Sequence, residues 1–332
     1  MQHLTSRFHR SIPVLAFVGA SIALALEVHR ADAAIVFTVG ALSGELIRYD
    51  SNDPVGTRTV ITTTLSSPTA LVAGPDGNLY IGQAGNGGSM APSIVRYEIA
   101  SNTFQTIHTF ESSIDTPGSL AFQGSSLLVG RNPAIGAAGA IRQLTNALGG
   151  AVSVADYTTG GNLASSPGLA VLSSGEFIVS DQFLNILSGV RSGSVKRFDA
   201  AGQYVSTVVE DGTSGLFGPA GLATDGTWLF IASSMTGDIL RTNLATGLTT
   251  TFASTGEKYG ASALALLADG SLLVGSEIFG HIRHFDANGT LLSTFAALDG
   301  PTAGFAVFDS VVPAPSALTL IALGFGACRR RR

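Results

Sequence analysis

The sequence predicts an all-β fold in which six four-stranded antiparallel blades form a ring, the architecture of a six-bladed β-propeller. Three observations predict it. A unit of roughly 50 residues recurs along the chain, each unit has the pattern of four short strands, and the segment between the two termini shows no helical periodicity. Glycine accounts for 41 of the 332 residues, and only 12% of the residues are charged, about half of the roughly 25% typical of soluble domains. We therefore expect many tight turns and sheets that are covered on both faces.

Each repeat begins with two short apolar strands joined by a tight turn. The turn carries Asp-Gly, Ser-Gly or a similar pair, and glycine favours a two-residue hairpin because it tolerates a positive φ. Four successive repeats place a proline near the start of the first strand, at spacings of 49, 50 and 52 residues. The five complete repeats start at Ser67, Thr116, Ser166, Gly218 and Gly260.

A third and a fourth strand complete each unit. The third strand alternates apolar and polar residues, as in SIVRYEI from Ser93 and GHIRHFDA from Gly280, and this period of two is typical of a β-strand. The fourth strand is short and polar, as in LTTTFAS from Leu248. Four strands in about 50 residues match one propeller blade.

The two ends of the repeat region complete each other. It opens with the patterns of a second, third and fourth strand, which begin at Ile35, Gly44 and Thr57. It closes with PTAGFAVFDS from Pro301, the pattern of a first strand with nothing after it. Joining the two gives one composite blade, which closes the ring without free sheet edges at the seam. The sequence therefore predicts six blades over residues 34–311, with seven blades as the alternative.

Residues 1–33 have the three-part pattern of a secretory signal peptide. Arg7 and Arg10 precede an apolar run over 12–26, and Ala31-Asp32-Ala33 provides small residues at the minus three and minus one positions. We expect the mature chain to begin near Ala34, with a permanent N-terminal anchor as the alternative.

Residues 312–332 combine a proline motif, an apolar stretch over 317–328 and a terminal arginine cluster. The stretch is short for a membrane span, but terminal arginines would hold it at the cytoplasmic face. This segment resembles the PEP-CTERM sorting signal of Gram-negative bacteria, with Pro-Ala-Pro in place of the usual Pro-Glu-Pro. The resemblance implies processing by signal peptidase and exosortase, membrane contact through the tail before processing, and a protein in the cell envelope or outside the cell. An ordinary tail anchor is the alternative. The residues that carry the resemblance are Pro313, Pro315, Arg329, Arg330, Arg331 and Arg332.

The repeat region resembles the six-bladed propellers of the NHL and gluconolactonase-like families over roughly residues 35–310. The segment FIVSDQ, in which Asp181 follows the second strand, is similar to the NHL strand that ends in Asp. The resemblance implies the six-bladed architecture. In the gluconolactonase family a glutamate precedes the first strand in a Gly-Glu-Gly-Pro context, whereas this chain reads Ser66-Ser67-Pro68 at the first such position.

Candidate ligand-binding residues follow the second strands. In a propeller these positions lie at one mouth of the central channel, so residues from different blades form a ring. Carboxylate and amide oxygens there suit a sugar or one Ca²⁺ or Mg²⁺ ion, with Asp181 and Glu277 as the metal ligands. The alternative is that the ring residues only form hydrogen bonds between neighbouring segments around a wet channel. The candidates are Gln83, Arg131, Asn132, Asp181, Gln182, Ser234 and Glu277.

Two further features of the sequence are an apolar segment that follows a second strand and a pair of histidines on a third strand. The segment 182–192 is apolar for a loop, and we expect it either to cover the channel as a lid or to offer a surface to a partner. His281 and His284 lie three residues apart on a predicted strand, so their side chains point to opposite faces and do not chelate one ion easily.

Charge and motifs limit the function. Eleven of the 18 Lys and Arg residues and 21 of the 23 Asp and Glu residues fall between the two terminal segments, which gives this region a net charge of about −10. A nucleic-acid partner is therefore not expected. No Ser-His-Asp set, Walker loop or dinucleotide motif is recognised. The sequence predicts an exported binding or scaffold module for an exopolysaccharide or an envelope protein, rather than an enzyme. The alternative is a secreted metal-dependent lactonase-like hydrolase or polysaccharide lyase that uses Asp181 and Glu277.

Overall fold

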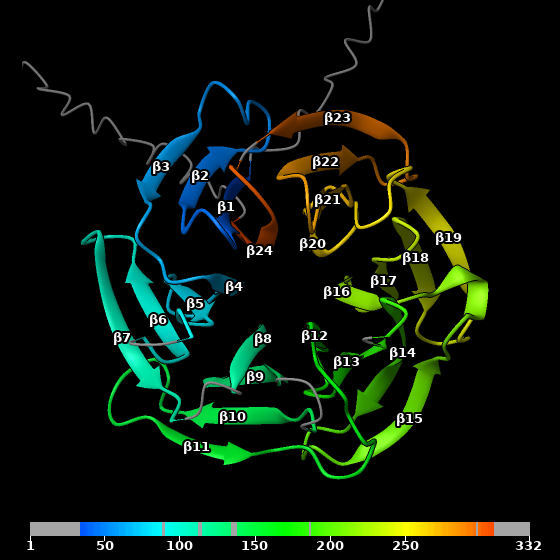
Figure 1. Cartoon of the computed structure of the whole chain (residues 1–332), viewed down its shortest axis with the longest axis horizontal. Coiled ribbons are helices and arrows are strands. Elements are labelled where there is room, and N and C mark those ends of the chain that lie inside the picture. Colours follow the sequence, from blue (N-terminus) through cyan, green and yellow to red (C-terminus); the bar gives the residue numbers. More distant parts are fainter. Residues whose placement is uncertain are drawn as a thin grey trace, which may run out of the picture. The chain divides into compact units, whose positions relative to one another are not determined.

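The computed structural model describes residues 34–308, except 88–89, 112–114, 134–137, 186 and 297. These residues form six four-stranded antiparallel sheets that surround a central axis, as Figure 1 shows. The prediction of an all-β, six-bladed propeller is confirmed. The predicted signal peptide (1–33) and sorting tail (312–332) lie outside the described residues. Within the described part of the chain, no helix has the length and apolar character needed to cross a membrane.

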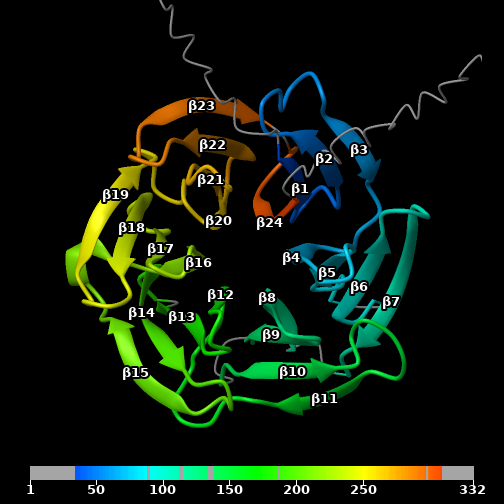
Figure 2. The ribbon, with the colours of Figure 1, turned by 180° about the vertical axis from the view of Figure 1, so that it is seen from behind.

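The blades are numbered here in chain order, with the composite blade first. In every blade the first strand lies nearest the axis, and Figure 2 shows the same order from behind. Blade 1 contains β24 (Thr302–Phe308), β1 (Ile35–Gly40), β2 (Leu46–Asp50) and β3 (Thr59–Thr62). Blade 2 contains β4 (Pro68–Ala73), β5 (Leu79–Gln83), β6 (Ser93–Glu98) and β7 (Thr103–Thr109). Blade 3 contains β8 (Thr116–Gln123), β9 (Ser126–Asn132), β10 (Ile141–Thr145) and β11 (Ser153–Asp156).

The other three blades repeat this arrangement. Blade 4 contains β12 (Gly168–Val171), β13 (Phe177–Asn185), β14 (Val190–Phe198) and β15 (Tyr204–Val209). Blade 5 contains β16 (Pro219–Thr224), β17 (Trp228–Ser233), β18 (Asp238–Asn243) and β19 (Thr249–Ser254), and the short 3-10 turn η1 (Thr213–Gly215) precedes it. Blade 6 contains β20 (Ala263–Leu266), β21 (Leu272–Gly275), β22 (His281–Phe285) and β23 (Leu291–Ala296).

Burial changes from the inside of a blade to its rim, and this explains the low charge content. All residues of β5 and β21 are buried because neighbouring blades cover both faces of a second strand. The third strand β6 mixes buried and half-buried positions, and the outer strand β7 is largely exposed. Polar uncharged side chains such as Thr103 and Thr106 face solvent on that rim.

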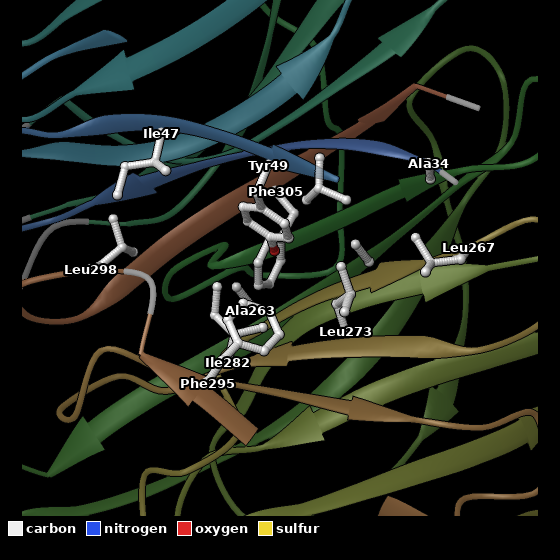
Figure 3. Packing of buried hydrophobic residues seen from close by; sticks show 12 residues of the cluster. Ala34, Ile47, Tyr49, Ala263, Leu267, Leu273, Ile282, Phe295, Leu298 and Phe305 are labelled. Carbon is white, nitrogen blue, oxygen red and sulfur yellow. The ribbon is translucent and has the colours of Figure 1, made fainter. Parts of the chain in front are cut away.

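The hydrophobic core lies between blades. At the interface of blades 1 and 6, Tyr49 and Phe305 lie against Phe295 and Ile282 (Figure 3). The rings of Tyr49 and Phe295 meet edge to face with centroids 5.4 Å apart. Burial raises the pKa of the Tyr49 hydroxyl well above its ordinary value. Each blade is therefore stabilised by its two neighbours as well as by its own sheet.

The composite blade closes the ring as predicted. β24 pairs with β1 in an antiparallel register that runs from Phe308 opposite Ile35 to Thr302 opposite Gly40. The Thr38 hydroxyl also donates a hydrogen bond to the Gly304 carbonyl at 3.0 Å, which joins residues 266 positions apart. Chain ends that are remote in sequence thus complete one sheet.

Antiparallel order gives the propeller two distinct faces. We call the face with the loops after second and fourth strands the top face, and the opposite one the bottom face. β1 is a second strand and runs towards the top, whereas β24 is a first strand and runs towards the bottom. The described chain therefore begins near Ala34 and ends at Phe308 on the bottom face.

The segment expected to be a loop over 182–192 is instead a β-hairpin. β13 and β14 each contain nine residues, and their ladder continues to the pair Asn185 and Val190. The Asn185 side chain accepts hydrogen bonds from the N–H groups of Leu187 and Ser188, at 3.1 and 3.2 Å, and so closes the tip. Gly193 has φ of 143°, and a Cβ there would overlap the Asp181 carbonyl, so glycine is required at this point of the ladder.

Candidate functional site

A cavity of about 690 Å³ follows the propeller axis. The six first strands line it, and they do so largely with alanine, glycine and leucine, so that the strands approach one another closely. Polar side chains gather at the top-face mouth, where Asn132, Gln182, Arg191 and Glu277 all belong to the lining. The mouth therefore combines two amides with one guanidinium and one carboxylate.

The seven candidate residues fall into two sets. Asn132, Gln182 and Glu277 line the cavity, whereas the lining does not include the other four, which are Gln83, Arg131, Asp181 and Ser234. Consecutive residues of a strand point to opposite sides, and this alternation separates neighbours such as Asp181 and Gln182.

A residue in the upper part of the second strand, or directly after it, holds the loop in front of the first strand of its own blade. The same contact recurs in four blades, between a side chain and the backbone of a residue 16 or 17 positions earlier. The contacts join Gln83 to Ser66, Asp181 to Ala164, Ser233 to Phe217 and Ser276 to Tyr259. In blade 3, Arg131 Nε forms an ion pair at 2.6 Å with Asp115, which lies in the corresponding loop. Different side chains at this position thus share one structural role.

Asp181 is fully engaged by protein donors. Its Oδ1 accepts from the Ala164 N–H at 2.6 Å, and its Oδ2 pairs with Lys196 Nζ at 2.5 Å. Lys196 also donates to the Gly161 carbonyl at 2.5 Å. Only 8% of Asp181 is exposed, so this ion pair fastens the loop over 161–164 to the middle of β13.

Gln182 and Ser234 also bond to backbone. The Gln182 side chain donates from Nε2 to the Pro219 carbonyl at 3.1 Å and thereby links blades 4 and 5. The Ser234 hydroxyl donates to the Gly218 carbonyl at 2.9 Å. Asn132 is exposed at the mouth of the cavity.

Glu277 forms an ion pair that the sequence reasoning missed. Its Oε2 lies 2.5 Å from Nη1 of Arg191, which reaches over blade 5 from the hairpin of blade 4. The Arg191 guanidinium also lies over the Tyr259 ring, 5.3 Å from its centroid. The hydrogen bond that Arg191 donates to Glu277 raises the pKa of Arg191 above its ordinary value. No local pattern in the sequence pairs these two residues, which lie 86 positions apart.

The geometry does not bring the two proposed metal ligands together. Asp181 is paired with Lys196 away from the cavity lining, and Glu277 is paired with Arg191 at the mouth. Among the described residues, no group of three or more His, Cys, Asp or Glu side chains is placed to hold a metal ion.

The two histidines on β22 contact different groups. His281 stacks with Phe279 at a centroid distance of 6.0 Å, whereas His284 Nε2 lies 2.9 Å from the Ser271 hydroxyl. Burial lowers the pKa of His284.

Comparison with known proteins identifies the fold class. No known protein family matches the chain, and no curated protein matches it in sequence. A chain in the crystal structure of a nidogen/laminin complex is similar in structure, with a TM-score of 0.65 and 13% identity. The match covers 83% of this chain and 98% of that chain. At this identity the likeness shows the propeller fold alone.

Proposed function

We propose that the chain is an exported binding or scaffold module of the cell envelope, held at the membrane through its C-terminal segment until exosortase processes that segment. The observation that carries the proposal is which side chains at the top-face mouth already form ion pairs within the chain. The carboxylates that could serve catalysis each form an ion pair with an arginine or lysine side chain of the same chain. The amide and apolar side chains of the mouth remain accessible to a ligand. This arrangement favours recognition over chemistry at the mouth.

The position of the described chain ends supports attachment through the tail. Both lie on the bottom face, opposite the mouth. A tether that continues from Phe308 would therefore leave the top face accessible. The signal-peptide pattern over 1–33 and the proline, apolar and arginine segments over 312–332 support export and sorting.

Mass spectrometry of the protein isolated from its host tests export and processing. We expect an N-terminus near Ala34 and a C-terminus soon after Pro315, in the envelope or extracellular fraction. Replacement of Arg329–Arg332 by serine should leave the tail uncleaved, because the basic cluster would no longer hold the segment at the membrane. Recovery of intact Cys328 and Arg332 in the exported wild-type protein would contradict the sorting proposal.

An envelope exopolysaccharide is the ligand class that we propose for the mouth. The amides of Asn132 and Gln182 offer both donors and acceptors, which suit sugar hydroxyl groups. On a glycan array we expect wild-type binding that Asn132→Ala weakens by about tenfold, roughly 1.4 kcal/mol. Asn288→Ala, at an exposed bottom-face turn, is the matched control and should bind as wild type does. An array without signal, or equal loss in both variants, argues against a sugar at this mouth.

A further inference from the structure

The top face carries a group of exposed apolar side chains over blades 4 to 6 that the mouth does not use. Each is at least 40% exposed, and Leu187 at the hairpin tip is 100% exposed. They come from the hairpin of β13 and β14, from the loop before β16 and from the loop after β21. We call this group the apolar patch; it consists of Leu184, Leu187, Phe217, Ile278 and Phe279.

Contacts of Arg191 bring the three segments of the apolar patch together. Arg191 lies opposite Leu184 in the ladder of β13 and β14, so these two side chains share one face of the hairpin. The ion pair of Arg191 with Glu277 places this face beside the loop that carries Ile278 and Phe279. A Cβ built on Gly218 would lie 2.8 Å from the Arg191 Cβ, so the hairpin also passes close to the segment of Phe217. The apolar patch is therefore one surface and not three separate exposures.

The hairpin presents its side chains in a fixed arrangement. Its ladder runs without a break from the core of blade 4 to Asn185, whose side chain closes the tip. Gly193 N–H also donates to the Asp211 carboxylate at 2.9 Å, which ties β14 to the loop before η1. Soluble monomers rarely expose contiguous apolar surface beyond several hundred Å², and one partner of a stable protein interface contributes about 800 Å². A preorganised apolar surface of this kind is typical of a protein-binding site.

The border of the apolar patch is acidic. On the top loops of blades 4 to 6, Asp181, Glu257 and Glu277 are neutralised by Lys196, Arg283 and Arg191. The charged side chains left without an ion pair to another described residue are four acidic and one basic, a net charge of −3. They are Glu210, Asp211, Asp238, Asp299 and Lys258.

We propose that the apolar patch docks a partner protein through a segment in which apolar side chains are interspersed with lysine or arginine. The apolar side chains of such a segment would bury the hairpin tip and the phenylalanines, and its basic groups would meet the acidic border. Charges of opposite sign at the border raise the association rate and select among partners of similar apolar content.

The acidic border favours a basic protein segment over two other occupants, an anionic lipid surface and a second copy of the chain. An anionic lipid surface would be repelled by the same carboxylates. Two copies that met through their patches would bring two borders of net charge −3 together. The inference goes beyond the proposed function, and it uses that proposal only for orientation, because a tether on the bottom face would point the apolar patch away from the membrane.

Two synthetic peptides provide the test on the full-length exported protein. They share the same leucine and phenylalanine positions, and one carries lysine and the other glutamate at every polar position. We expect fluorescence anisotropy to show the lysine peptide bound about tenfold or more tightly than the glutamate peptide, with the preference reduced by salt. Glu210→Lys with Asp299→Lys should remove that preference, because it replaces two of the negative charges of the border. Both residues are exposed and form no ion pair with the described chain, so the change breaks no such contact.

Matched variants assign the binding to the apolar patch. Leu184→Ser with Leu187→Ser should weaken binding of the lysine peptide by about tenfold or more. Val55→Ser with Leu248→Ser is the control, because these bottom-face side chains are 72% and 64% exposed and lie away from the patch. Unchanged circular dichroism and thermal midpoints establish that both double variants fold.

Three outcomes would overturn the proposal. The first is equal loss of peptide binding in the patch and control variants. The second is co-sedimentation with phosphatidylglycerol vesicles that only the patch variant loses, which would assign the surface to lipid. The third is self-association in analytical ultracentrifugation that only the patch variant loses, which would assign it to a second copy. Glycan binding and tail processing do not involve Leu184 or Leu187, so these results stand apart from those that test the proposed function.

Discussion

A chain that stops before Thr302 is expected not to form a stable propeller. It lacks β24, so β1 loses all its pairing on the inner side of blade 1, and Thr38 loses its acceptor at Gly304. Phe305 is removed from the cluster that joins blades 1 and 6. The seam would then expose two sheet surfaces and the free edge of β1, an open template for aggregation.

Circular dichroism and calorimetry of two truncated chains measure this effect. A chain that ends at Val311, after β24, is the matched control and should unfold in one cooperative transition as the full chain does. The chain that ends at Gly300 should show no such transition or should be recovered as aggregate. A cooperative transition at the wild-type midpoint in the shorter chain would show that the composite blade does not stabilise the ring.

Asp181→Ala is expected to lower the free energy of unfolding by about 3–5 kcal/mol. The substitution leaves the Lys196 ammonium buried without its counter-charge and leaves the Ala164 N–H without its acceptor. The side chains of Asp181 and Lys196 are only 11% and 13% exposed, so water replaces the lost partner poorly. The loop over 161–164 should then detach from β13.

The double variant Asp181→Ala with Lys196→Met isolates the cause. Because it removes both charges and keeps the lysine's apolar volume, it should recover most of the stability lost by the single variant. Urea unfolding measures all the variants, and Glu210→Ala, at an exposed carboxylate, should change stability by less than about 0.5 kcal/mol. If the single and double variants are equally unstable, the loss does not arise from an unpaired lysine.

The blade count could be predicted from sequence because its signals are local. Apolar strands, glycine turns and the period of the repeats are each visible within a few tens of residues. The incomplete units that begin at Ile35 and Pro301 each lack what the other supplies, which indicates that they pair with each other. The fourth strand of blade 3, β11 (Ser153–Asp156), was expected from the repeat but was not located, because a strand of four residues, two of them polar, does not stand out from a loop. The extension of β13 was also missed, because the segment after this second strand was interpreted as a loop, and Asn185 and Ser188 are typical turn residues.

The candidate site could be predicted only in part, for a reason of register. The sequence located the ends of the second strands, but it did not show which of two consecutive residues faces the channel. Asp181 and Gln182 differ by one position, and the strand alternation sends the first to Lys196 and the second towards the mouth. Arg191 could not be assigned to Glu277 from sequence, because their contact depends on how a hairpin leans across the neighbouring blade.

The composite blade also sets the order in which the fold can be completed. Its inner strand is the last part of the propeller to be synthesised, while the strands it joins are the first. Contacts of such large sequence separation form slowly, because a long chain must be ordered before they contribute. A chain that crosses a membrane from its N-terminus would therefore arrive with five blades able to assemble and the first one open. The ring closes only when β24 is available to pair with β1, so the fold is completed only once the whole propeller sequence is present.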